Sequence, residues 1–64
     1  MTTKEEFEKM WNERKINRIA WLISLTTGGS VFADNVQFGD SLVTVHYKGY
    51  ETAYLLYSTI LEVL

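Results

Sequence analysis

The sequence predicts a small α+β domain whose elements follow the order α-β-β-α, and three observations lead to this prediction. Two overlapping capping boxes open the chain, the second formed by Thr3 and Glu6, and they satisfy the first free amides of a helix. After Ser30, β-branched and aromatic residues alternate between turn-forming residues, as they do in strands. From Tyr50 onward, apolar residues recur three and four positions apart, which is the spacing of one helix face.

The first helix is expected to be long and to cover about Thr3–Thr27. Acidic residues occupy its first turns and basic residues follow, which is the order that the helix dipole favours. The stretch Ile16–Leu25 is apolar nearly all round, and Gly28-Gly29 then supplies a C-terminal cap. Every second residue of Ile19–Leu25 is large and apolar, as in a strand. A second interpretation therefore stays open, in which residues 18–27 form an additional strand.

The middle of the chain predicts a two-stranded antiparallel hairpin around Gly39-Asp40, a short Gly-containing connection between two alternating segments. Val43, Val45 and Tyr47 are expected to point one way, and the residues between them to form a partly exposed face. The last element is expected to be a helix from about Glu51. Its polar side is narrow, so the hairpin alone is not expected to cover its apolar surface.

The 64 residues are expected to form a single domain, 1–64, with a thin stability margin, because so short a chain buries only about 60% of its unfolded surface. Disulfides, structural metals or assembly usually help a domain of this size. The chain has no Cys, and His46 is its only His, so we expect no disulfide, no metal site and no cofactor. Assembly into an oligomer is the remaining source of added stability, and a two-fold homodimer is the commonest closed oligomer. We therefore expect a homodimer.

Charge and hydropathy exclude several classes of function. The net charge of −2 and the pI near 5.2 argue against a protein dedicated to a phosphate backbone, and equally against an acidic mimic of DNA. The apolar runs are too short to span a bilayer, and the acidic start lacks the basic region of a signal peptide. We expect no membrane contact and a cytoplasmic location.

The aromatic share of 14% is high, and amphipathic rings are enriched at protein interfaces. So small a domain is not expected to bury all of them within one copy. The candidate partner-binding residues are large side chains from the two expected helices and the end of the hairpin: Trp11, Trp21, Tyr50, Tyr54, Tyr57 and Leu61.

An alternative function is nucleic-acid binding through the basic part of the first helix. Arg14, Lys15 and Arg18 lie between Trp11 and Trp21, and cations interleaved with aromatic rings suit single-stranded nucleic acid. Acidic residues in the same stretch offset most of this positive charge, and a solvated helix face has the same composition. The sequence therefore favours binding to protein over binding to nucleic acid.

Catalysis is not expected. His46 could pair with Asp34 or Asp40, but nothing in the sequence brings them together, and no nucleophile motif accompanies them. The glycines of Thr26–Ser30 follow the expected helix, whereas phosphate loops precede one. The sequence therefore favours a small protein-protein interaction module, a regulator or inhibitor that acts by binding a partner protein and is not an enzyme.

Overall fold

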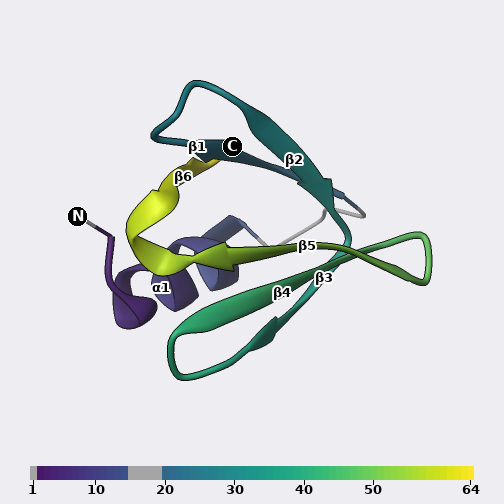
Figure 1. Cartoon of the computed structure of the whole chain (residues 1–64), viewed down its shortest axis with the longest axis horizontal. Helices are drawn as coiled ribbons and strands as arrows, with labels where there is room; N and C mark the ends of the chain where they lie inside the picture. The colour runs from purple at the N-terminus through teal and green to yellow at the C-terminus, as the bar shows by residue number, and fades with distance from the viewer. Residues whose placement is uncertain (1, 15–19) are drawn as a thin grey trace.

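The computed structural model describes residues 2–14 and 20–64, and Figure 1 shows one helix beside two small sheets. The elements, in chain order, are the helix α1 (Lys4–Arg14), the strands β1 (Trp21–Leu25), β2 (Ser30–Ala33), β3 (Asn35–Phe38), β4 (Leu42–Tyr47) and β5 (Tyr50–Leu56), the 3₁₀ turn η1 (Tyr57–Thr59) and the strand β6 (Ile60–Val63).

The six strands form two three-stranded antiparallel sheets, with the orders β2-β1-β6 and β3-β4-β5. Two chain segments pass from one sheet to the other. β2 continues into β3 through the single residue Asp34, and β5 continues into β6 through η1 (Figure 1). Strands that change sheets make the corners of such packings, and the two inner faces then share one core.

The predicted α-β-β-α order is wrong, and the closing helix from Glu51 is the larger error. That segment contains β5, η1 and β6, so the described part of the chain is mostly β with one N-terminal helix. The segment is apolar on both sides, so its residues fit a period of two as well as a period near 3.6. Pairing with two other strands decides between the periods, because β5 bonds to β4 and β6 bonds to β1.

The long first helix is also wrong. α1 ends at Arg14, residues 15–19 lie outside the described residues, and Trp21–Leu25 is the strand β1. The second interpretation, an additional strand within 18–27, is therefore confirmed for Trp21–Leu25. β1 is the central strand of its sheet and buries Trp21 and Ile23 on one face. The expected helix cap at Gly28 is part of the β1-β2 turn, with φ +97°.

Two local predictions are confirmed. The Thr3 amide donates to the Glu6 carboxylate at 3.1 Å, and the Glu6 amide donates to Thr3 Oγ1 at 3.2 Å, which is a capping box. The hairpin at Gly39-Asp40 joins β3 to β4, and its Val43 is fully buried as the alternation predicts. Both predictions rest on neighbours within a few residues, where tertiary context has little influence.

The core lies between the two sheets and α1. Phe7 of α1 is fully buried, and its ring centroid lies 5.7 Å from that of Phe38 in β3 and 6.0 Å from that of Tyr57 in η1. One turn along the helix, Trp11 stacks on Trp21 of β1 at 4.3 Å between centroids. The helix therefore joins both sheets to one aromatic cluster.

Candidate functional site

The outer face of the β3-β4-β5 sheet carries the exposed apolar side chains that lie closest together in the strand register. Leu42 of β4 lies opposite Leu56 of β5, and Thr44 lies opposite Tyr54. Side chains two residues apart on a strand share a face, and directly opposite residues do too. These four side chains therefore form two adjacent rows on one face, and the buried Val43 between them points into the core.

We call Leu42, Tyr54 and Leu56 the outer patch. Their exposed fractions are 42%, 61% and 51%, large values for apolar side chains in a domain whose core residues are nearly all below 5%. No charged side chain belongs to the patch, and half-exposed Thr44 completes its second row. The patch reaches the edge of the sheet, because among the described strands β5 pairs only with β4.

Tyr54 is held in place by its neighbour on β5. Its hydroxyl donates a hydrogen bond to the Glu51 carboxylate, and this bond is the main reason why the pKa of Tyr54 lies above its usual value, with the negative charge of Glu51 adding to it. Tyr54 therefore stays neutral at physiological pH, and its ring is oriented over the outer face.

A bulge separates Tyr50 from this patch. Val45 lies opposite Ala53, but His46 lies opposite Glu51, so Thr52 is an extra residue in β5. Beyond the bulge, Tyr50 lies opposite Tyr47, which is three positions from Thr44 on β4 and therefore on the other face.

Tyr47 belongs to a second exposed group at the tip of the β4-β5 hairpin. Its ring lies 6.0 Å from that of Phe32 in a stacked arrangement, and Lys48 Nζ lies 5.4 Å from the Tyr47 ring centroid. This group is small and mixes charge with aromatic surface. It lies across the sheet from the outer patch and does not extend it.

The six predicted partner-binding residues do not form one surface. Trp11, Trp21 and Tyr57 lie in the core with exposed fractions of 4–6%, so the structure gives them a packing role. Three others are exposed but separate: Tyr54 lies in the outer patch, Tyr50 at the hairpin tip, and Leu61 on β6. Leu61 is itself a bulge residue, because Ser24 lies opposite Glu62 and Leu25 opposite Ile60.

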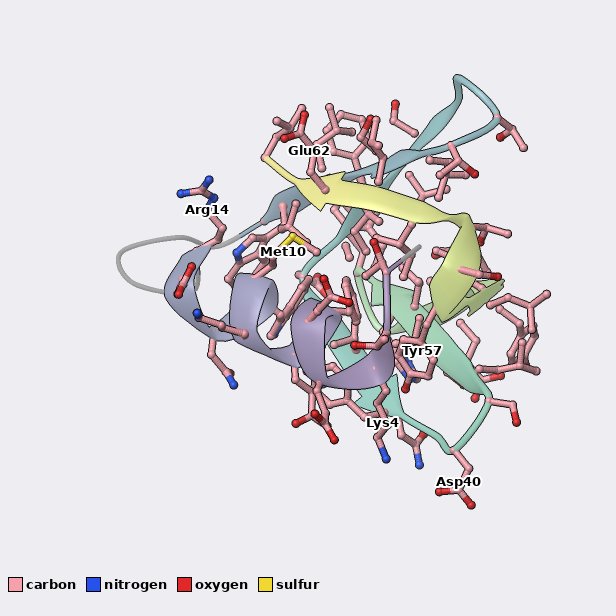
Figure 2. The ribbon with its side chains drawn as sticks, turned by 90° about the vertical axis from the view of Figure 1, so that its left-hand side faces the viewer. Lys4, Met10, Arg14, Asp40, Tyr57 and Glu62 are labelled. Carbon is pink, nitrogen blue, oxygen red and sulfur yellow. The ribbon has the colours of Figure 1, made fainter. Side chains whose placement is uncertain are left out.

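The basic residues proposed for nucleic acid are described only in part. Arg14 ends α1 at the opposite end from Lys4 (Figure 2), and its Nε donates to the Val63 carbonyl of β6 at 3.1 Å. Lys15 and Arg18 lie outside the described residues. Arg14 therefore has a structural contact of its own at the edge of β6.

The groups considered for catalysis make other contacts. The Asp34 carboxylate accepts a hydrogen bond from the Lys48 amide at 2.8 Å, and Asp40 lies 4.0 Å from Lys4 Nζ (Figure 2). His46 meets Asp34 through the backbone, where its carbonyl accepts from the Asp34 amide at 3.0 Å. Within residues 2–14 and 20–64, there is neither a pocket nor a group of three His, Asp or Glu side chains able to hold a metal.

Leu42 and Leu56 are the site residues that the sequence did not single out. A signal for Leu42 exists in the hairpin alternation, because Leu42 directly precedes Val43 and therefore belongs to the other face of the strand. Leu56 lies in the segment predicted as the closing helix, and its position opposite Leu42 exists only because that segment is the strand β5.

No known protein family matches this chain, and no curated protein or solved structure is significantly similar to it. What defines the molecule is its own architecture, a mostly β protein of two three-stranded sheets closed by one helix. In the described part of the chain, no helix is long and apolar enough to cross a membrane.

Proposed function

We propose that this protein is a small protein-protein interaction module, a regulator or inhibitor that acts by covering a surface of a partner protein with its outer patch. One observation carries the proposal: Leu42, Tyr54 and Leu56 are 42–61% exposed and contiguous on a regular sheet face. Covering apolar surface contributes roughly 25 cal/mol per Å², so a contiguous patch gains more from one partner than scattered residues do.

The chemistry of the patch indicates the kind of surface it fits. Tyrosine is a frequent interface anchor because its ring supplies area while its hydroxyl makes a polar contact at the rim. Tyr54 has Leu56 beside it on β5, Thr44 across on β4 and the Glu51 carboxylate at its hydroxyl, so the complementary surface is apolar at its centre with polar or basic groups at its border. The proposal is for binding rather than catalysis, and on the sequence grounds given above we propose the cytoplasm as its location.

The test compares two double variants that remove the same residue types. Tyr54→Ser with Leu56→Ser removes two of the three residues of the outer patch, whereas Tyr50→Ser with Leu61→Ser removes a Tyr and a Leu elsewhere that are somewhat more exposed, at 75% and 56%. Each protein is used to capture partners from native host lysate, and bound proteins are quantified. We expect a partner retained by the wild type and the control and reduced about tenfold or more by the patch variant, which corresponds to about 1.4 kcal/mol.

Equal retention by the two variants would contradict the proposal, provided circular dichroism shows both to be folded. Raising the salt concentration separates the alternative function, because binding to phosphate backbones weakens steeply with ionic strength while apolar docking does not. Capture that disappears with salt and carries nucleic acid would favour the basic residues near Arg14 over the patch.

A further inference from the structure

We infer that a second copy of this chain occupies the outer patch, with β5 of one copy pairing antiparallel to β5 of the other across a two-fold axis. The inference rests on the proposed function and names the partner and the docking geometry. An edge strand presents a row of unpaired amides and carbonyls that an identical strand can satisfy, since antiparallel pairing is symmetric about a two-fold axis.

The edge of β6 that does not pair with β1 is already covered by Thr2 and by the helix α1. Thr2 Oγ1 donates to the Ile60 carbonyl at 2.7 Å, and Arg14 Nε donates to the Val63 carbonyl at 3.1 Å. α1 itself packs along this strand, as Figure 2 shows beside Arg14 and Glu62. Covering an edge with a helix is one of the ways in which proteins prevent edge-to-edge pairing.

The edges of β2 and β3 are short. Each strand has four residues, and the chain turns between the sheets at Asp34, so neither offers a long straight template. At the end of β3, the Phe38 ring lies against Phe7 of α1. These edges therefore have two of the usual protections, short length and a bend.

β5 has one of the usual protections, a bulge at Thr52, but not the cover that β6 has. It is the longest strand, with seven residues, and contains neither Lys nor Pro. No described strand pairs with its second edge. The bulge at Thr52 leaves Ala53–Leu56 as a regular segment that is only as long as β2 or β3, so its exposed apolar face, and not its length, distinguishes this edge. This segment carries Tyr54 and Leu56 of the outer patch, so the uncovered edge and the exposed apolar face coincide.

The register of the two copies follows from the alternation of side chains. Outer residues must lie opposite outer residues, since a slip of one position would place them against core-facing ones. The register with Leu55 opposite itself places Tyr54 against Leu56 of the second copy. It then extends the outer patch into a stripe across both copies, from Leu42 of one to Leu42 of the other.

Charge does not oppose a second copy as the partner. The stripe itself contains no charged side chain, and the Glu51 carboxylate beside it accepts a hydrogen bond from Tyr54, so pairing does not require burying an unpaired ion. In the antiparallel arrangement, the hairpin tip of one copy, which carries exposed Lys48, approaches the end of the other sheet that carries Asp40. The Asp40 side chain is fully exposed and lies 4.0 Å from Lys4 Nζ, so that end of the sheet carries charges of both signs and does not oppose Lys48 with a net positive charge.

The available area predicts a weak dimer. A standard interface covers about 800 Å² on each partner, nearly a fifth of the 4349 Å² that this molecule exposes. A four-residue edge with one Tyr and two Leu covers less than that. Such an interface belongs with the smaller, transient class, so we expect dissociation in the micromolar range rather than below it.

The test is sedimentation equilibrium of the purified full chain from about 10 μM to about 1 mM, the range in which a weak dimer forms. Leu56→Lys puts a charge on the stripe, and Leu61→Lys is the matched control, because the two leucines are 51% and 56% exposed. We expect the wild type and Leu61→Lys to dimerise with rising concentration, and Leu56→Lys to weaken association at least tenfold.

Amide hydrogen exchange supplies a measurement that needs no variant. Exchange within Ala53–Leu56 is expected to slow as the wild-type concentration rises, whereas exchange in β6 stays unchanged. A wild type that stays monomeric at 1 mM, or a Leu56→Lys variant that dimerises as well as Leu61→Lys, overturns the inference. A monomer that still captures a partner through the outer patch would leave the proposed function standing, so the two failures are distinguishable.

Discussion

Tyr57 shows how one side chain can join three elements of this fold. Its ring packs against Phe7 of α1, and its hydroxyl donates to the Gly39 carbonyl at 2.6 Å, at the β3-β4 turn. Gly39 has no room for a side chain, since a Cβ there would lie 2.6 Å from the Leu42 carbonyl oxygen. Tyr57 therefore ties η1 to the β3-β4 turn, which the Gly39 amide closes by donating to the Leu42 carbonyl at 2.9 Å.

The variant Tyr57→Phe keeps the ring and removes the hydroxyl. We expect it to lower the free energy of unfolding by about 0.5–1.5 kcal/mol, the usual net value of one hydrogen bond, measured by urea denaturation at pH 8. Tyr54→Phe is the control, since its hydroxyl bonds only to Glu51 on the exposed face and its loss should matter less. An equal effect of the two substitutions would contradict a structural role for the Tyr57 hydroxyl.

The difference in unfolding free energy between the wild type and Tyr57→Phe is expected to depend on pH. Burial, and then the negative charge of Glu8, raise the pKa of Tyr57 above its ordinary value of 10.0. Unfolded Tyr57 therefore loses its proton near pH 10 while folded Tyr57 keeps it, so its contribution is complete below pH 10 and is lost as the pH rises through the folded pKa. The stability difference between the wild type and Tyr57→Phe should shrink above pH 10, and a constant difference would contradict the raised pKa.

At the scale of elements, the features that could be predicted from the sequence are those determined by residues close together in the chain. The capping box of α1 and the hairpin at Gly39-Asp40 were both predictable, because their signals lie within a few positions. Trp21–Leu25 was predicted as a strand only in the second interpretation, and Tyr50–Val63 was not predicted as strands, because both segments are apolar on both sides and strand pairing decides their structure.

The candidate site was predictable only to the same extent, because strand pairing determines which of its residues lie together. Tyr54 could be predicted as an interface residue from its type, but its neighbours could not. The bulge at Thr52 moves Tyr50 to the opposite face from Tyr54, and the sequence carries no sign of an inserted residue there. Composition indicated candidate interface residues, whereas register decides which of them share a face.

The β4-β5 turn offers an element-scale prediction. Lys48 has φ +54° and Gly49 has φ +84°, the positive pair that a tight hairpin turn requires. Asn adopts this conformation more readily than Lys, and the Lys48 amide that donates to Asp34 belongs to the backbone. Lys48→Asn should therefore raise the free energy of unfolding, by about 0.5 kcal/mol in urea denaturation.

The contact of Lys48 with the Tyr47 ring opposes this gain and requires a control. Lys48→Ala loses the same cation but keeps the backbone cost of a positive φ, so it should be less stable than Lys48→Asn. Equal stabilities of the two variants would show that the turn geometry does not limit the hairpin.

At the scale of the whole molecule, α1 serves as a third layer that closes the core. Phe7 is fully buried and packs against aromatic rings from β3 and η1, and Trp11 stacks on Trp21 of β1. Neither sheet has more than three strands, so each depends on the other and on the helix for cover. The fold should therefore unfold as one unit, as small single domains usually do.

Phe7→Ala tests this dependence. Truncating a buried Phe typically costs about 3–5 kcal/mol, which is most of the stability that a chain of this length usually has. We expect the variant to lose helix and sheet together, so that far-ultraviolet circular dichroism and fluorescence of the Trp11-Trp21 pair report one coincident transition. Phe7→Leu, which keeps most of the apolar volume, should retain the fold at lower stability. A Phe7→Ala protein that keeps its sheets while the helix signal alone disappears would show that the two sheets are stable without α1, and the helix would then be an accessory to the core rather than one of its layers.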